Sequence, residues 1–384
     1  MHLLAYGGRN DKLFVGAMSE SLFFPAQPYV RELEYQFDRL AQQVGCWNVE
    51  PEEQLTCLRN QDVTSLQAAN HAQHFPGHDD GPLLPIFYWT PCVDGDFLQD
   101  LPYRLMREGR LLDDVPVLFG TNTNEGSVFA YNSLTPSDLT SFFSVNYPRL
   151  TRSDLASILS LYHPPLPPLP NHGPWYPTTS LAYGEATFIC PSNNFLDAFV
   201  SSSSVSPTSS SLPPPTTTFL IKNQTETARS RKKAKAFAYR FNVHDHALQA
   251  AGLGVPHLFD AAAIFGPDSI DSGGFGAGEK SSYRTYNKPV VSMFMAYWIS
   301  FVRTLDPNNL REEGSPEWQE WLDEDNLVNG DGGGDGDGNK SRKMRRLLVE
   351  LGNTRMEEVG EEEKKRCRFW EALGDRLEQL QRVS

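Results

Sequence analysis

The spacing of hydrophobic residues along the first part of the chain predicts a short strand followed by helices. Residues 13–18 form an apolar run that is typical of a short buried strand. Residues 29–45 repeat apolar positions at helical intervals, and 50–70 form a second helical region with a break at Pro51. The stretch 72–85 is rich in His, Gly, Asp and Pro and is expected to be a loop.

The middle of the chain alternates between strand and helix patterns. Residues 115–120 form an apolar run with strand character, and 136–147 and 151–162 have helical patterns, each entered through a Ser, Thr or Asp cap. The proline-laden stretch 163–180 is expected to be a connection. Residues 234–242 alternate polar and apolar side chains, which predicts another strand.

The C-terminal part is predicted to be mainly helical. We expect a long aromatic-rich helix at 287–304, helical periodicity at 342–350 and a charged terminal helix at 361–382. Strands that alternate with helices favour the α/β class, with a largely parallel sheet covered by helices.

Two stretches interrupt these patterns. Residues 201–218 are rich in Ser, Thr and Pro, and 329–340 are rich in Gly and Asp. Neither can bury enough apolar surface to offset its ordering entropy, so both are expected to be low-complexity loops. We treat 1–384 as one domain containing these two loops.

Composition narrows the class of protein. The chain has 384 residues, 39% of them hydrophobic, which suits a globular protein with a substantial core. A formal net charge of −14 opposes binding to nucleic acid, and the basic run 229–235 is interpreted as a solvated loop. No apolar window is long enough for a membrane span. Residues 1–8 lack the basic start and long apolar core of a signal peptide.

Five cysteines are present, and their spacing alone does not assign pairs. They are Cys46, Cys57, Cys92, Cys190 and Cys367. The loop between the first two has the size that a local disulfide closes. Five reduced thiols in a cytosolic protein are equally compatible with the composition.

Two side chains at the ends of elements are the leading candidates for chemistry. Glu125 lies on a turn-rich tip after the predicted strand 115–120, where ligand-facing groups collect in α/β sheets. His257 is flanked by Pro256 and Leu258, which would hold its ring direction. Taken alone, Glu125 could be a solvated turn residue and His257 a core histidine. Together, an acid followed by a histidine fits the Ser, acid, His order of a hydrolase triad. However, no G-x-S-x-G occurs in the sequence.

Metal and cofactor sites are weakly indicated. His71 and His74, with Asp79 and Asp80 nearby, form a weak ligand pattern. Residues 331–339 alternate Asp and Gly like a calcium loop, but they lack the bidentate Glu and the flanking helices. We therefore predict no metal and no cofactor.

Two motifs resemble those of a known family, the type-B carboxylesterases in their cholinesterase-like and fungal lipase-like branch. Residues 122–127 look like its N-x-x-E-G-S acid motif, and 254–257 followed by 264–266 look like its histidine motif. The resemblance implies an α/β-hydrolase fold, N-terminally truncated, with a mostly parallel sheet and helices on both faces. It also implies that Glu125 is the triad acid and His257 the triad base.

The same resemblance assigns the cysteines. It implies a short-loop disulfide between Cys46 and Cys57, and a second between Cys190 and Cys367 that ties the last helix to the body. Cys92 would remain a free thiol. Disulfides shift the expected environment toward a secreted, extracellular protein.

Further residues take roles by resemblance. Ser21 falls where the family has a buried serine that supports the acid, and Phe129, with Val128 more weakly, falls where the acyl side of the pocket is lined. Residues 1–4 resemble the end of the nucleophile helix, which would place the serine upstream of Met1.

The expected function is therefore a serine carboxylic-ester hydrolase for small-molecule or lipid esters, with an incomplete triad that leaves this chain inactive. The alternative is a non-catalytic cholinesterase-like binding or adhesion protein.

Overall fold

A five-stranded sheet forms the centre of the molecule. The computed structural model describes residues 1–77, 81–202, 234–270, 281–322 and 343–380. The strands follow the chain in the order β1-β2-β3-β4-β5; β1 to β4 are parallel and β5 is antiparallel to β4. Their bounds are β1 Ala17–Glu20, β2 Val117–Asn122, β3 Ala236–Phe241, β4 Arg345–Val349 and β5 Arg355–Glu358.

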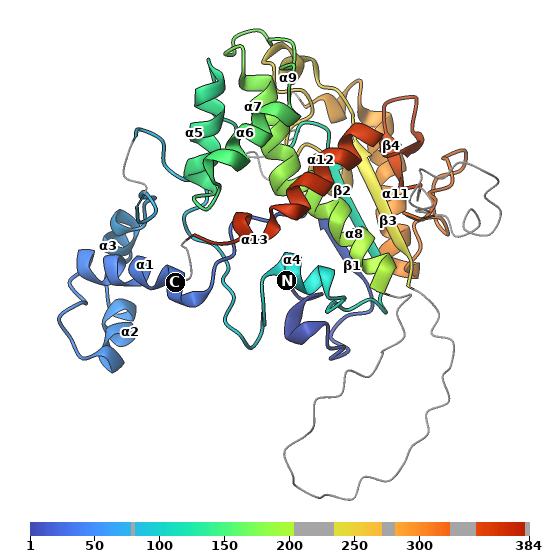
Figure 1. Cartoon of the computed structure of the whole chain (residues 1–384). Helices are drawn as coiled ribbons and strands as arrows, with labels where there is room; N and C mark the ends of the chain where they lie inside the picture. Colours follow the sequence, from blue (N-terminus) through green and yellow to red (C-terminus); the bar gives the residue numbers. More distant parts are fainter. Residues whose placement is uncertain (78–80, 203–233, 271–280, 323–342, 381–384) are drawn as a thin grey trace, which may run out of the picture.

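Helices cover both faces of this sheet. In the described residues the α-helices are α1 Val30–Gln43, α2 Pro51–Arg59, α3 Val63–Ala69, α4 Pro102–Arg107, α5 Pro136–Asn146, α6 Arg152–Leu161, α7 Tyr176–Gly184, α8 Cys190–Ser202, α9 His246–Ala250, α10 Ala261–Phe265, α11 Lys288–Thr304, α12 Glu361–Ala372 and α13 Gly374–Leu377. Figure 1 shows α8 and α11 on opposite sides of the strands, while α1 to α3 form a group away from the sheet.

Strand β2 shows why the sheet is covered twice. Val117 and Phe119 pack in one hydrophobic cluster with α8, and Leu118 packs in another cluster with α10 and α11. All six residues of β2 are buried, as expected for a central strand whose alternating side chains meet a helix layer on each face. The carboxyl ends of β1 and β2 lie at the same edge, because Glu20 pairs with Gly120.

Both disulfides that the resemblance implied are present. Cys46–Cys57 joins the turn after α1 to α2, and Cys190–Cys367 joins α8 to α12 across a sequence separation of 177. Cys92 is the free cysteine.

The helix predictions were largely right, with corrections at the ends. Residues 29–45, 136–147, 151–162 and 287–304 contain α1, α5, α6 and α11, and the region 50–70 divides into α2 and α3. Pro51 begins α2 instead of breaking it, because the first helical position tolerates a missing N–H. Within the predicted terminal helix 361–382, α12 and α13 are separated at Leu373 and helix ends at Leu377, and 381–382 lie outside the described residues.

Three predictions were wrong. Residues 342–350 contain strand β4, not a helix; its buried run Leu347–Val349 lies inside the sheet, and a short apolar run does not distinguish helix from strand by periodicity. The connection 163–180 contains the start of α7, which places Pro177 in its first turn. In 13–18, pairing begins only at Ala17, so Leu13 and Val15 are exposed.

Several predictions fall outside the described residues. These are the loop 329–340, all of the loop 201–218 except its first two residues, which end α8, the basic run up to residue 233, and Asp79 and Asp80. Among the described helices, none has the length and apolar character to cross a membrane.

Candidate active site

Glu125 occupies the tip that follows β2, and its side chain is completely buried. Its Oε1 accepts hydrogen bonds from the Ser21 hydroxyl at 2.6 Å and from the Asn122 backbone N–H at 2.5 Å. Its Oε2 lies 2.6 Å from Nδ1 of His257, 132 positions along the chain. A buried carboxylate with three partners is held in one orientation.

Ser21 reaches Glu125 because the chain turns sharply at the end of β1. Ser21 has φ 55, a left-handed conformation, while its N–H still bonds the carbonyl of Gly120 at 2.7 Å. The hydroxyl donates to Oε1 of Glu125, so its proton is engaged by that carboxylate.

His257 is brought to Glu125 by a joint between two loops. The Asn124 N–H bonds the Val255 carbonyl at 2.9 Å, and the Val255 N–H bonds Oδ1 of Asn124 at 2.9 Å. Gly254 has φ 64, and a Cβ there would lie 2.2 Å from Oδ1 of Asn124. The joint therefore requires glycine at 254, two residues before Pro256 and three before His257.

The two ring nitrogens of His257 have different surroundings. Nδ1 faces a fully buried carboxylate that accepts hydrogen bonds, which assigns the proton to Nδ1 in the neutral ring. Nε2 has no hydrogen-bonding partner among the described residues, and 16% of the side chain remains exposed. Nε2 is thus available to accept a proton from a hydroxyl.

Aromatic side chains form a wall beside the histidine. Phe129 meets the His257 ring edge-on at 5.2 Å between centroids, and Phe188 lies 4.6 Å away. Phe87 continues the wall from Phe129 at 5.7 Å, and Phe23 lies 4.5 Å from Phe87. Sequence reasoning found only Phe129, because the other three rings come from distant segments.

Val128 was the weaker candidate for this lining. It is half-buried next to Phe129 and takes no part in these ring contacts.

A second buried carboxylate, Asp260, lies near the pair, and the sequence analysis did not identify it. Its Oδ1 accepts from the Asn122 side chain at 2.8 Å, and its Oδ2 accepts from the Tyr239 hydroxyl at 2.6 Å. Burial raises the pKa of Asp260 above its ordinary value. Burial, together with the charge of Asp260, also raises the pKa of Glu20 to about 7. Asn122 links the two carboxylates, since its backbone N–H bonds Glu125.

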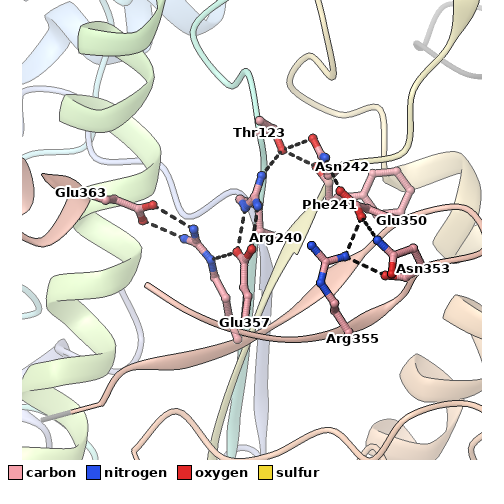
Figure 2. Close-up of polar contacts among 10 residues, drawn as sticks. Thr123, Arg240, Phe241, Asn242, Glu350, Asn353, Arg355, Glu357 and Glu363 are labelled. Carbon is pink, nitrogen blue, oxygen red and sulfur yellow. Dashed lines mark hydrogen bonds and ion pairs between the residues drawn. The ribbon is translucent and has the colours of Figure 1, made fainter. Parts of the chain in front are cut away.

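An ion-pair network anchors the strand end that carries the acid loop (Figure 2). Arg240 donates to the Thr123 hydroxyl at 3.1 Å and forms two hydrogen bonds with Glu357 at 2.6 and 2.8 Å. Glu357 also accepts from Arg346, which makes two further bonds to Glu363 of α12. The residue two positions before Glu125 is therefore tied to β5 and α12.

Nothing in the described part of the chain gathers three or more His, Cys, Asp or Glu side chains in a metal-binding arrangement. His71 instead lies with Nδ1 3.2 Å from the carbonyl of Ala68.

Comparison with known proteins identifies the family. A model of the carboxylesterase family matches residues 3–330. The chain belongs to the carboxylesterase family. The crystal structure of Aspergillus niger EstA superposes with a TM-score of 0.78 at 36% identity, covering 98% of this chain and 62% of that one. The fold is therefore the α/β-hydrolase fold.

Two further relatives match smaller shares of this chain. Bos taurus bile salt-activated lipase is 24% identical over 307 residues, which cover 76% of this chain and 44% of the lipase. Mus musculus cholinesterase is 32% identical over 132 residues, covering 34% of this chain and 21% of that protein. The chain thus spans less than two thirds of the length of these relatives.

Proposed function

We propose that this chain carries the acid and the base of a serine carboxylic-ester hydrolase. The observation that supports this is the 2.6 Å contact between the buried Glu125 carboxylate and Nδ1 of His257, with Nε2 left open. In the proposal Glu125 is the triad acid, His257 the general base, and Ser21 a positioning residue for Glu125.

The reaction follows from this geometry. His257 Nε2 takes the proton of a serine hydroxyl as its oxygen attacks the ester carbonyl, and Glu125 stabilises the imidazolium that forms. His257 then gives the proton to the leaving alcohol, and an acyl-enzyme remains. Water, deprotonated by the same nitrogen, releases the carboxylic acid and restores the serine.

The sequence does not contain the expected nucleophile motif. No G-x-S-x-G occurs in the 384 residues, and Ser21 already donates to Glu125. We propose that the serine comes from sequence outside these 384 residues, and that the chain as given does not turn over esters. The greater length of the relatives supports this.

The substrate class is proposed from the wall beside His257. Phe129, Phe188, Phe87 and Phe23 present apolar surface next to the reacting nitrogen, which suits an uncharged ester with an apolar acyl group. The relatives carry the names EstA, bile salt-activated lipase and cholinesterase.

We also propose secretion. The two disulfides support it, and Arthroderma benhamiae secreted lipase is 28% identical over 151 residues, 38% of this chain and 26% of the lipase.

Nuclear magnetic resonance of the ¹⁵N-labelled imidazole tests the pairing of acid and base. A proton held between Nδ1 of His257 and a buried carboxylate should resonate far downfield, and Glu125→Gln should remove that signal while Glu108→Gln, an exposed control, keeps it. If wild-type protein shows no such signal at any pH where the ring is protonated on Nδ1, the pairing is wrong.

A p-nitrophenyl ester assay tests the missing nucleophile. We expect no turnover from the 384-residue chain. Turnover that His257→Ala abolishes would show that a serine within these residues acts as the nucleophile.

The absence of a nucleophile motif favours one other candidate, a non-catalytic binding protein with the same fold. The sequence of the transcript and the start of the mature protein distinguish the hydrolase from the binding protein. An in-frame G-x-S-x-G upstream of codon 1 supports the hydrolase, and a mature protein that begins at Met1 supports the binding protein.

A further inference from the structure

A cavity of about 400 Å³ lies beside the loop that carries Glu125. Four segments and Ile189 form its walls: the segments are the acid loop 123–127, helix α7, the connection 166–169 and the stretch from His244 to Gly254. This volume is within the range that binds small molecules.

The cavity shares Glu125 with the candidate active site and otherwise has a different lining. Among the residues that line it, Glu125 is the only member of the proposed triad; His257, Phe129 and Phe188 line none of it. The Glu125 carboxylate is completely buried and engaged by Ser21, Asn122 and His257, so a ligand in the cavity would not compete for it.

The lining fits an uncharged, largely aliphatic ligand. Its apolar part includes Leu166, Pro167, Leu169, Leu181, Ile189 and Leu253. The lining contains no Lys, Arg or Asp side chain, so a charged ligand would lose its hydration without gaining a counter-charge.

One polar group in the lining lacks a partner. Ser127 is 5% exposed, and its hydroxyl has no hydrogen-bonding partner among the described residues. The oxygen itself is enclosed by protein, so a ligand hydroxyl reaches it only when the Ser127 side chain rotates toward the cavity; because buried hydroxyls are normally hydrogen-bonded, such a bond is favourable. Its own backbone carbonyl is already taken by the Tyr176 hydroxyl at 2.6 Å, which fixes Ser127 against α7.

The walls of the cavity include the joint that holds the acid and the base together. Asn124 and Gly254 both line it, and Asn124 bonds Val255 through its backbone N–H and its side chain. A ligand that packs against Asn124 therefore acts on a contact only two residues from His257.

We propose that this cavity binds an uncharged aliphatic alcohol and that its occupancy alters the Glu125–His257 contact. Alcohols are one product of ester hydrolysis, so the site would let a product act back on the triad; this last step rests on the proposed function. Binding itself does not depend on hydrolysis.

Titration of the 384-residue protein with 1-octanol tests the proposal by calorimetry and by the imidazole signals of His257. We expect saturable one-to-one binding and a His257 shift that saturates at the same concentration. Leu181→Trp should fill the cavity and weaken binding at least about 10-fold. Ser127→Ala should weaken it roughly 2- to 10-fold, as loss of one hydrogen bond predicts. Leu134→Trp, at a residue 64% exposed outside the cavity, is the matched control and should bind like wild type.

Three results would overturn the proposal. Octanol uptake that never saturates, or saturable binding unchanged in Leu181→Trp, would show that the alcohol sits elsewhere. Binding with no change at His257 would disprove the coupling. If Leu181→Trp does not fold, Leu253→Trp, in the stretch from His244 to Gly254, replaces it as the variant that fills the cavity. A failure here leaves the downfield His257 signal in place, so it is distinguishable from a failure of the proposed triad.

Discussion

Asn124 is the side chain whose removal should separate the acid from the base without touching either. Its Oδ1 accepts the N–H of Val255 at 2.9 Å, and Val255 is completely buried. Asn124→Ala leaves that N–H without a partner in the interior. Such an unsatisfied donor costs about 1–3 kcal/mol, so the free energy of unfolding should fall by about that amount.

The variant should also loosen the histidine loop. Only the Asn124 backbone bond to the Val255 carbonyl would remain across the joint. The Glu125–His257 bond at 2.6 Å tolerates little displacement, because hydrogen bonds weaken steeply with distance and angle. We expect the downfield Nδ1 proton of His257 to broaden or disappear. Urea unfolding and imidazole spectra of the same sample measure both effects.

Two further variants make the interpretation specific. Asn124→Asp keeps an acceptor for Val255 and should retain the His257 signal. Gly254→Ala, on the histidine side of the joint, should also lower stability and weaken the His257 signal. Its Cβ would lie 2.2 Å from Oδ1 of Asn124, and residue 254 has φ 64. The reasoning fails if Asn124→Ala leaves both stability and signal at wild-type values.

Three more predictions follow from buried contacts. Replacing Cys190 and Cys367 by Ser removes a disulfide that spans a sequence separation of 177. The chain-entropy model predicts a loss of about 5 kcal/mol in the free energy of unfolding, and a loss below about 2 kcal/mol in urea unfolding would contradict it. Glu20 has its pKa raised from 4.5 to about 7, so the stability it contributes is present below pH 4.5 and lost as pH rises through 7. Glu20→Gln should therefore raise the free energy of unfolding at pH 8 by about 1–3 kcal/mol relative to wild type, a range that allows for the partial exposure of Glu20. At pH 4 the two proteins should have the same stability. Arg366→Met removes the two hydrogen bonds that Arg366 donates to Glu185, a carboxylate only 2% exposed. We expect the free energy of unfolding to fall by about 3–5 kcal/mol at pH 8 and by less at pH 5. Adding Glu185→Gln should restore part of the loss.

Elements with strong local signals could be predicted from the sequence. Helices α5 and α6 begin directly after Thr135 and Thr151, each of which caps the backbone N–H three residues later, as the sequence indicated. Strand β4 could not be predicted from the local sequence. Leu347 and Leu348 are buried on opposite faces of the strand, and such a short apolar run fits a helix as well as a strand. Which reading wins depends on the neighbouring strands β3 and β5, which the local sequence does not contain.

The candidate site also has residues that the sequence predicted and residues that it could not predict. Glu125 and His257 stand at the ends of elements within recognisable motifs, so their meeting could be anticipated; whether they act in catalysis stays a prediction. The rings around His257 could not be anticipated, since Phe23 and Phe188 carry no signal until the chain brings them together. The resemblance supplied the disulfides, which cysteine spacing alone left open.

Asp260 shows most clearly why local sequence misses part of such a site. It directly precedes α10, where an aspartate would ordinarily be interpreted as a helix cap. In the structure its side chain makes no cap bond and instead accepts from Asn122 and Tyr239, which lie 138 and 21 positions away. Those two donors converge only because β2 and β3 are neighbours in the sheet. A buried carboxylate close to Glu125 therefore arises from strand order, a property that no window of sequence around Asp260 contains.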